Sequence, residues 1–284
     1  MIEQAKQLTE PRTVLITGAT DGLGRALALR LVADGATVVL HGRDPAKLDQ
    51  TADRIRETHG VPRPLTIPAD LADLAQVRQL ASDVRGAVDR LDVLVNNAGI
   101  GAGNPDGRSR RVSADGYELR FAVNYLAGVL LSVELLSLLR QSSAARIVNV
   151  ASIRQRALDF DDLMLERSYS GIRAYEQSKL AQVMSGFELA GRVSASEVTV
   201  NSLHPATYMP TKMVLEEVGT SIDSLEDGVA NTFRLAWDRG LLGTTGKFFD
   251  RTRAASANAQ AYDLSARAEL WTRTLAMVDH PGVQ

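Results

Sequence analysis

Short apolar runs rich in β-branched residues alternate along this chain with longer segments of helical periodicity. Apolar runs of this length suit strands that are buried on both faces of a sheet. The pattern predicts strands near 13–17, 36–40, 64–67, 91–95, 146–150, 197–203 and 246–249. It predicts helices near 22–33, 45–58, 73–88, 114–139, 175–193 and 225–237. Such alternation predicts an α/β fold, a doubly wound parallel sheet with helices on both faces.

A single domain is expected over residues 1–284, because no linker, internal repeat or low-complexity tract interrupts the pattern. The first eleven residues and the tail after Val278 are expected to be loosely held. Inside the helix predicted at 114–139, the stretch from Val129 to Leu139 is mostly Leu and Val. A helix that is apolar on more than one side is buried in the fold or against a partner.

Composition narrows the function classes. The formal charge of -2 gives no footprint for nucleic-acid binding, and the 45% hydrophobic content suffices for a core. The chain has no Cys and four scattered His, so neither disulfides nor a metal site is expected. No apolar run approaches the ~18 residues of a membrane span, so a soluble cytoplasmic protein without membrane contact is expected.

A glycine-rich turn, Gly18-Ala19-Thr20-Asp21-Gly22-Leu23-Gly24, separates the first predicted strand from its helix. With the second strand it forms the strand–turn–helix–strand unit that a dinucleotide-binding site of the Rossmann type requires. Glycines let the backbone approach a pyrophosphate, and the helix N-terminus offers unpaired N–H groups. The spacing is Gly-x-x-x-Gly-x-Gly rather than Gly-x-Gly-x-x-Gly. A glycine cluster alone is more often a plain turn, but this context predicts cofactor binding.

Tyr175 and Lys179 are four residues apart, the spacing of one helix face. A Tyr normally titrates near pKa ~10, and a fixed cation close to the phenol lowers that pKa. Such a Tyr can exchange a proton with a substrate hydroxyl or carbonyl oxygen. The alternative is a surface helix with an unrelated Tyr and Lys. Tyr208 and Lys212 share the spacing, but Pro210 between them disrupts a shared helix face.

These motifs appear in the order found in one enzyme family. From about Thr13 to about Phe249 the chain resembles a short-chain dehydrogenase/reductase of the simple, single-domain kind. The motifs that carry the resemblance are Thr17-Gly18-x-x-x-Gly22-x-Gly24, Asp70-Leu71, Asn96-Asn97-Ala98-Gly99, Asn124, Ser152, Tyr175 with Lys179, and Asn201-Ser202-Leu203-His204-Pro205. The long interval from Ser152 to Tyr175, with Gly246-Lys247-Phe248-Phe249 and Leu270-Trp271, resembles the retinol dehydrogenase-like branch.

The resemblance implies an oxidoreductase that transfers a hydride between a nicotinamide cofactor and an alcohol, ketone or aldehyde. Tyr175 would be the acid/base, Ser152 would hydrogen-bond the substrate oxygen, and Lys179 would lower the Tyr175 pKa and bind the nicotinamide ribose. Asn124 would hold a water that links Lys179 to solvent. The cofactor-binding residues expected from the family are Thr17, Gly18, Thr20, Asp21, Gly22, Leu23, Gly24, Arg43, Asp70, Leu71, Asn97, Ala98, Gly99, Tyr175, Lys179, Pro205 and Thr207.

Other readings of these residues remain open. A Ser after a strand is usually a turn residue, and a helical Asn usually points to solvent. A dinucleotide-binding regulator without turnover, or an epimerase or dehydratase on the same fold, would share the motifs. The family often pairs subunits through the helix that contains Asn124, so a homodimer or homotetramer is expected.

Cofactor choice depends on the end of the second strand. NAD-preferring relatives generally carry Asp where this chain has Gly42, whereas Arg43 can pair with a 2′-phosphate through two parallel hydrogen bonds. Asp44 before Pro45 is better read as a helix N-cap. Asp21 stands where many NADP-binding relatives carry Lys or Arg and argues the other way. NADP is favoured, and NAD remains possible.

The substrate walls should come from 100–116, 154–173 and 208–222, the last two as lids. An apolar or aromatic substrate is the natural expectation, because apolar residues are frequent there: Leu158, Phe160, Leu163, Met164, Leu165, Tyr208, Met209, Met213 and Val214. The alternative is that 159–165 forms a short helix that packs for stability. Pro205-Ala206 replaces the family's Pro-Gly, and Thr211 lies one residue late for the nicotinamide-binding Thr, so Thr207 is expected to serve instead.

Overall fold

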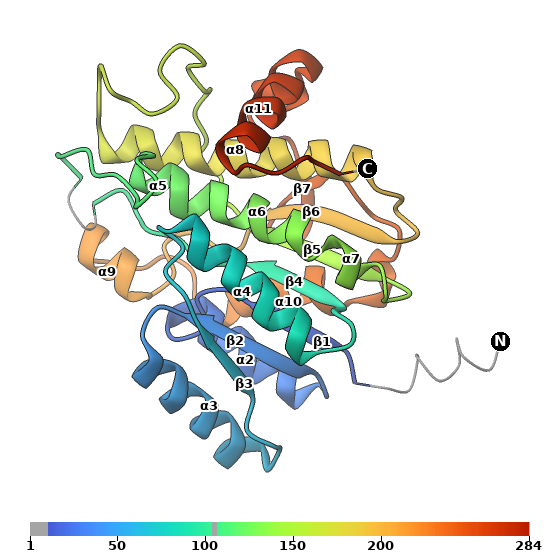
Figure 1. Ribbon diagram of the computed structural model, residues 1–284. Helices are drawn as coiled ribbons and strands as arrows, with labels where there is room; N and C mark the ends of the chain where they lie inside the picture. The colour runs from blue at the N-terminus through green and yellow to red at the C-terminus, as the bar shows by residue number, and fades with distance from the viewer. Residues whose placement is uncertain (1–10, 104–106, 284) are drawn as a thin grey trace.

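An eight-stranded sheet forms the centre of the computed structural model, which describes residues 11–103 and 107–283 (Figure 1). Its strands are β1 Thr13–Ile16, β2 Thr37–Gly42, β3 Leu65–Pro68, β4 Val93–Asn96, β5 Ala145–Val150, β6 Val198–His204, β7 Lys247–Asp250 and β8 Arg253–Ala255. The order is β3-β2-β1-β4-β5-β6-β7-β8, and only the β7–β8 pair is antiparallel. The order reverses between β1 and β4, the point where ligands bind in such sheets. The predicted doubly wound fold is confirmed.

Helices cover both faces of this sheet. They are α2 Gly22–Ala33, α3 Pro45–His59, α4 Leu74–Ala87, α5 Leu119–Phe121, the π-helical turn η1 Ala122–Leu126, α6 Ala127–Glu134, α7 Leu136–Leu139, α8 Gly171–Arg192, α9 Lys212–Val218, α10 Leu225–Trp237, η2 Arg239–Leu241, η3 Ala259–Tyr262 and α11 Leu264–Met277. Local chemistry sets several starts. The carboxylates of Asp21, Asp44 and Asp73 accept hydrogen bonds from backbone N–H groups in the first turns of α2, α3 and α4.

Two predicted helices have different bounds in the structure. The helix expected from residue 114 begins at Leu119 and contains the π turn η1, where the i→i+5 pattern interrupts the α-helix. The helix expected from Tyr175 begins at Gly171, because the Ser170 side chain accepts from Arg173 N and caps it. Tyr175 therefore lies in the second turn of α8 rather than at its start.

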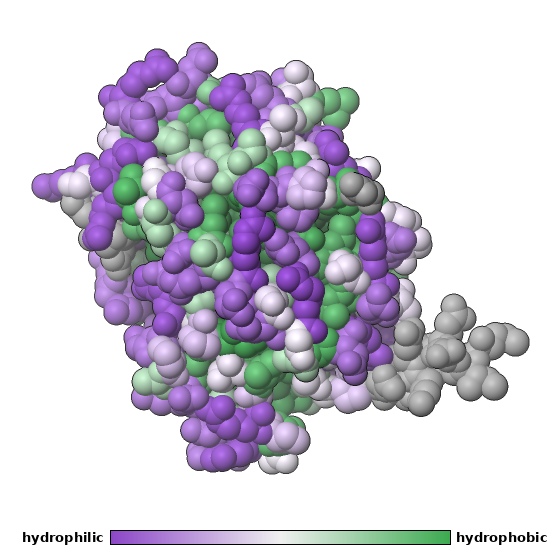
Figure 2. Space-filling model, viewed as in Figure 1, coloured by the Kyte–Doolittle hydropathy of each residue, from purple (hydrophilic) through white to green (hydrophobic). Residues whose placement is uncertain are grey.

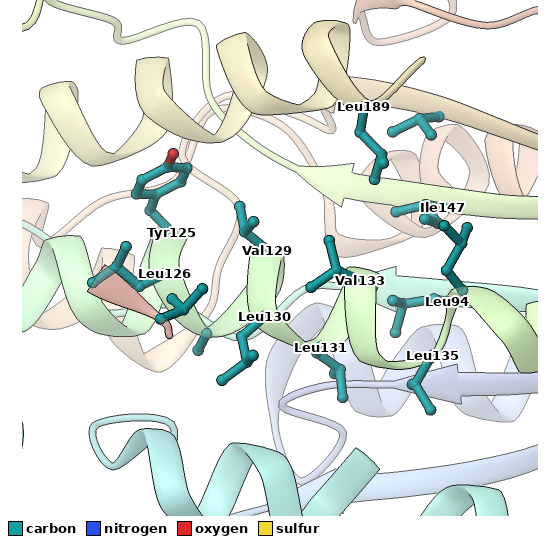
Figure 3. Close-up of a cluster of buried hydrophobic side chains, with 14 of the residues drawn as sticks. Leu94, Tyr125, Leu126, Val129, Leu130, Leu131, Val133, Leu135, Ile147 and Leu189 are labelled. Carbon is teal, nitrogen blue, oxygen red and sulfur yellow. The ribbon is translucent and has the colours of Figure 1, made fainter. Parts of the chain in front are cut away.

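The apolar stretch from Val129 to Leu139 is buried within its own chain. Figure 3 shows side chains of α6 packed beside Leu94 of β4, Ile147 of β5 and Leu189 of α8. On another side α6 contacts α4, where Arg78 and Arg85 both pair with Glu134. The apolar character that suggested a partner subunit is therefore accounted for by packing inside this chain.

The C-terminal segment is part of the core. Helix α11 packs on α8, and Trp271 and Val278 are buried. The Thr274 hydroxyl lies 2.5 Å from the hydroxyl of Tyr125, which is itself fully buried in η1. Arg78 donates to the carbonyls of Val278 and Asp279. The chain is thus anchored up to Asp279, whereas the expectation for the N-terminus falls almost entirely on residues 1–10, outside the described residues.

No helix among the described residues is both long and apolar enough to cross a membrane. The face in Figure 2 is a mosaic of hydrophilic and hydrophobic residues.

Candidate active site

The glycine turn between β1 and α2 has a backbone conformation that favours glycine. Gly18 and Gly22 have φ values of 67° and 47°, in the left-handed region that favours glycine. A Cβ placed on Gly24 would lie 2.2 Å from the Gly18 carbonyl oxygen. Asp21 caps the helix by accepting from Gly22 N at 2.7 Å. The turn is therefore tightly closed, and it leads directly into the N-terminus of α2.

The end of β4 holds this turn in place. The Thr17 hydroxyl oxygen accepts from the backbone N–H groups of Asn97 and Ala98, at 2.9 and 3.0 Å. The Asn97 amide donates in return to the carbonyls of Thr17 and Gly18, at 2.8 and 3.2 Å. Thr17, Asn97 and Ala98, which are expected at the cofactor, therefore connect the ends of β1 and β4 through hydrogen bonds.

His41 is a further member of this site that the sequence argument missed. It is buried at the end of β2, where its Nδ1 accepts from Gly18 N at 3.3 Å and its Nε2 lies 3.1 Å from the Ala69 carbonyl. These partners assign the proton to Nε2, because a carbonyl can only accept. Burial lowers the pKa of His41 to about 4, so the ring is neutral. His41 thereby joins the glycine turn to the end of β3, although no metal-ligand spacing marked it in the sequence.

Arg43 follows His41 and Gly42 on the surface. Its side chain is exposed and makes no hydrogen bond or ion pair with the residues that the structure describes. A Cβ on Gly42 would lie 2.6 Å from Thr20 Cγ2, so glycine lets the end of β2 approach the turn. The prediction that Asp44 caps α3 is confirmed, since its carboxylate accepts from Ala46 N at 3.0 Å. Arg43 is the cation that remains available beside the turn.

Asp70 and Leu71 follow β3. The Asp70 carboxylate accepts from Ala72 N at 3.0 Å, and its backbone N–H donates to the Gln76 side chain at 2.9 Å. Leu71 is buried in the core. Both residues thus shape the turn after β3, and their contact with an adenine ring stays a prediction.

Ser152 and Tyr175 meet at the carboxyl edge of the sheet. Ser152 lies two residues past β5, and its hydroxyl is close enough to the Tyr175 phenol to lower the pKa of that phenol. Burial raises the pKa of Tyr175 overall, because it outweighs the opposing effect of the Ser152 hydroxyl. The Glu217 carboxylate adds to the raised pKa of Tyr175, and the Arg154 guanidinium acts against it. Tyr175 is therefore protonated near neutral pH, and the raised pKa makes its phenol a weaker acid than that of a free Tyr.

The pKa of Tyr175 is raised in this structure, whereas the sequence predicts that Lys179 lowers it. Its Nζ lies 5.9 Å from the centre of the Tyr175 ring and donates to the Val150 carbonyl at 2.8 Å and to Gln182 Oε1 at 3.4 Å. Burial lowers the pKa of Lys179 to about 8, so its own charge is weakly held near neutral pH. Burial of the phenol therefore outweighs a cation that lies beneath the ring and bonds elsewhere.

Asn124 lies in η1 and is buried. Its Oδ1 accepts from Ile100 N at 2.8 Å, and its Nδ2 donates to the Ile100 carbonyl at 3.1 Å and to the Ser178 hydroxyl at 3.0 Å. The side chain thus fixes the segment after β4 to α8 near Lys179. Single π turns inside α-helices often mark functional sites. The water that Asn124 was expected to hold stays a prediction.

Thr207 and Thr211, the two candidates for the nicotinamide-binding Thr, have different surroundings in the structure. The Thr207 hydroxyl lies 3.1 Å from both His204 Nε2 and Arg251 Nη2, so it is already bonded by the chain. Pro205 supplies its carbonyl to the Asn231 amide at 2.8 Å. Thr211 instead lies against the glycine turn, where its Cγ2 would be 3.1 Å from a Cβ on Gly22. Contact of Thr207 with the nicotinamide stays a prediction.

Several residues expected to line the substrate site are core residues. Leu158, Leu163 and Leu165 are buried in the hydrophobic core, and the segment 159–165 forms turns rather than a helix. Leu158 donates its N–H to Gln260 Oε1 at 2.6 Å, and Gln260 Nε2 donates back to the Leu158 carbonyl at 3.1 Å. Leu158 is therefore held against η3, and a role of 154–173 as a substrate lid stays a prediction.

A family model described as short chain dehydrogenase matches residues 12–220. This chain belongs to the short-chain dehydrogenase family. Retinol dehydrogenase 14 of Homo sapiens is 33% identical over 298 residues, which cover 95% of this chain and 87% of that protein. A protein of Streptomyces sp. (strain C5), provisionally named daunorubicin C-13 ketoreductase DnrU, is 36% identical over 279 residues, which cover 94% and 92%. The expected retinol dehydrogenase-like branch is confirmed.

Solved structures of similar proteins agree with this assignment. A protein from Mycobacterium Paratuberculosis has a TM-score of 0.75 at 27% identity, with 96% of this chain and 97% of that chain covered. A provisionally named short chain dehydrogenase from Shigella flexneri 2a, complexed with NADP, has a TM-score of 0.71 at 27% identity, with 87% and 99% covered. This short-chain dehydrogenase is thus an NAD(P)-dependent oxidoreductase that acts on CH–OH or C=O groups of small molecules.

The fold of this short-chain dehydrogenase gathers the predicted residues at one edge of the sheet. The glycine turn, Arg43 and Ser152 follow β1, β2 and β5, and α8 presents Tyr175 and Lys179 to the same edge. No group of three His, Asp or Glu side chains that could hold a metal ion occurs in residues 11–103 or 107–283. This edge of the sheet is therefore the candidate active site.

Proposed function

We propose that this enzyme transfers a hydride between NADP and an apolar alcohol, ketone or aldehyde, with Tyr175 as the acid/base. The observation that carries the proposal is the closeness of the Ser152 hydroxyl to the Tyr175 phenol, whose pKa it lowers, with Lys179 Nζ 5.9 Å from the centre of the ring. A hydroxyl and a phenol that converge in this way can both contact one substrate oxygen. The nicotinamide cofactor supplies or accepts the hydride when bound.

The residues of the chain move and hold the proton. In reduction the Tyr175 hydroxyl donates its proton to the substrate oxygen, and in oxidation the phenolate takes it. Ser152 holds that oxygen through a hydrogen bond. Lys179, whose Nζ donates to the Val150 carbonyl, provides a positive charge under the phenolate that forms when the proton leaves. Asn124 keeps the segment at Ile100 against α8, so that the site stays closed on this side.

The preference for NADP rests on Arg43. Its exposed guanidinium follows Gly42, beside a glycine turn whose φ values and tight closure fit a pyrophosphate. Asp21, which argued against a 2′-phosphate, uses its carboxylate to cap α2 and lies 3.7 Å from Arg25, so its charge is partly offset. Relatives solved with NADP and NADPH support the same preference.

The proposed substrate class rests on the names of relatives and on the predicted lid. Relatives named retinol dehydrogenase and ketoreductase act, by those names, on an apolar alcohol and on a ketone. With the leucines of 158–165 in the core, the apolar contacts are assigned to half-buried Met213 and Val214 and to exposed Ile153 beside Ser152.

A panel of apolar ketones and aldehydes with NADPH and with NADH tests this function, followed through nicotinamide absorbance. Turnover of at least one carbonyl substrate with NADPH is expected, and the Ser152→Ala and Tyr175→Phe variants should lose it. Binding of cofactor without turnover across the panel would contradict the proposal.

The oligomeric state and the cellular location stay predictions. Because α6 is covered by its own chain, a homodimer or homotetramer would need a different surface from the one that first suggested it. Light scattering on the purified protein decides the oligomeric state.

A further inference from the structure

Residues 101–103, which follow β4, form a segment beside the catalytic residues that is called the seat below. The Arg120 side chain is fully buried, and it donates to the carbonyls of Gly101 and Ala102 at 2.7 and 2.9 Å. The same guanidinium lies 3.7 Å from buried Glu118 and donates to the Tyr169 hydroxyl at 2.5 Å. With its carbonyls bound from below by a buried cation, this segment presents its N–H groups to the opposite side.

Residues 208–222 form a lid whose two ends are tied together. Asp223 N donates to the Thr207 carbonyl and Ile222 N to the Tyr208 carbonyl, each at 3.0 Å. The Asp223 carboxylate accepts from Thr207 N and from Arg251 Nη2, each at 2.6 Å. The stem of the lid is therefore fixed, and α9 projects from it.

Glu217 of α9 bridges the lid to the seat. Its Oε1 accepts from Gly103 N at 2.9 Å, and its Oε2 accepts from Ala102 N at 3.2 Å. A Cβ on Gly101 would lie 2.0 Å from Glu217 Oε1 and 2.8 Å from Met213 Cγ. The closed arrangement thus requires glycine at position 101. No residue of α9 is buried, so apolar packing holds this helix only weakly and the two hydrogen bonds matter.

The lid extends over both halves of the site. At its start Thr211 lies against Gly22 of the glycine turn. Farther along, Tyr208 and Glu217 lie near enough to Tyr175 to raise its pKa. Closure of α9 therefore covers the cofactor turn and the acid/base together.

We propose that Glu217 is the latch of this lid, and that cofactor and substrate exchange require its two hydrogen bonds to Ala102 and Gly103 to break. The proposal rests on the proposed function only in placing the substrate beneath the lid. The seat bound by Arg120 and the stem bound by Asp223 stay in place, while α9 opens and closes between them.

Two variants break the latch from opposite sides. Glu217→Gln keeps the size of the side chain but replaces one acceptor oxygen by an NH₂ donor that faces a backbone N–H. Gly101→Ala leaves Glu217 intact and fills the space that its carboxylate occupies. The matched controls are Glu216→Gln, whose carboxylate lies 3.7 Å from Lys212 Nζ, and Gly86→Ala, where a Cβ meets nothing within 4 Å.

Hydrogen exchange of the Ala102 and Gly103 amides reads the latch without any substrate. In both latch variants these amides should exchange about tenfold faster or more, the scale of a lost hydrogen bond to a charged group, while β5 amides stay unchanged. The dissociation rate of NADPH, followed by stopped-flow fluorescence, should rise in the latch variants and not in the controls. Unchanged exchange at these two amides, or faster exchange with unchanged NADPH release, would overturn the proposal. Because neither readout needs turnover, failure of the carbonyl panel alone leaves the latch test intact.

Discussion

Leu158→Ala separates a structural role from a substrate role for the segment between Ser152 and Tyr175. Leu158 is only 6% exposed and belongs to the same core as α6 and α8. Its backbone N–H and carbonyl are both bonded to Gln260, and these bonds survive the substitution. The variant therefore empties a core site without removing a polar contact.

Emptied core leucines cost about 2–5 kcal/mol, and the low end applies where the site can collapse. The two hydrogen bonds from Gln260 hold the backbone at Leu158 in place, so collapse is restricted and we expect about 3–4 kcal/mol. For a chain of this size, about 2–4 °C of melting temperature is lost per kcal/mol, so the melting temperature should fall by roughly 6–16 °C.

The assay measures melting temperature and the ranking of carbonyl substrates on the same samples. The control is Ile153→Ala, because Ile153 is 53% exposed and lies directly beside Ser152. Exposed substitutions usually change stability by less than about 0.5 kcal/mol, so Ile153→Ala should keep its melting temperature and alter the ranking. Leu158→Ala should do the reverse. A changed ranking for Leu158→Ala at an unchanged melting temperature would refute the reasoning.

Three further predictions concern single side chains. Arg43→Ala should weaken NADPH binding by about tenfold or more and leave NADH nearly unchanged, since a charge-assisted contact contributes on the order of 1.5–3 kcal/mol; equal losses for both cofactors would exclude a contact with the 2′-phosphate. His41 has a folded pKa of about 4 against 6.5 in the unfolded chain, so the unfolded state takes up the proton first and stability should fall as pH drops from about 6.5 to 4. His41→Gln can still accept from Gly18 and donate to Ala69, so it should flatten that loss of stability in acid denaturation and keep NADPH binding. His41→Leu should weaken NADPH binding. The pKa of Lys179 is 10.5 in the unfolded chain but about 8 in the fold, so folding becomes more favourable, and stability should rise, as pH increases from about 8 to 10.5. Lys179→Met should remove this rise from the pH dependence of stability.

The sequence predicted those parts of the fold that short-range chemistry decides. The strand runs, the glycine turn between the first strand and its helix, and the Asp44 cap before Pro45 all follow from local residue preferences, and the structure confirms them. Register along the sheet then placed Ser152 and the glycine turn at the same edge. These features depend on neighbours within a few residues, so a single sequence suffices to find them.

Features that depend on distant partners could not be read from the sequence. The role of His41 comes from Ala69 and Gly18, and the engagement of Thr207 comes from Arg251. The burial of Leu158 likewise depends on Gln260, more than a hundred residues away in the chain. The apolar residues of that segment predict that it is buried or binds a substrate, but only the fold shows that Leu158 lies in the core.

The raised pKa of Tyr175 shows the same limit. The spacing to Lys179 was right, yet the direction of the shift depends on burial and on Glu217, which reaches the site from the lid. In the structure the Lys179 ammonium bonds to Val150 rather than to the phenol. Local spacing thus identified the pair, and the surrounding groups decided its electrostatics.

Single-turnover reduction by Tyr175→Phe with NADPH bound tests the central claim most directly. The substitution removes the phenol hydroxyl and keeps the ring, so NADPH affinity should stay close to that of the wild type. If Tyr175 donates the proton, the rate of hydride transfer should fall by roughly 10²- to 10⁴-fold, the usual contribution of general acid–base catalysis. A loss of only about twofold or less would be far smaller than that contribution and would contradict the assignment of Tyr175 as the acid/base.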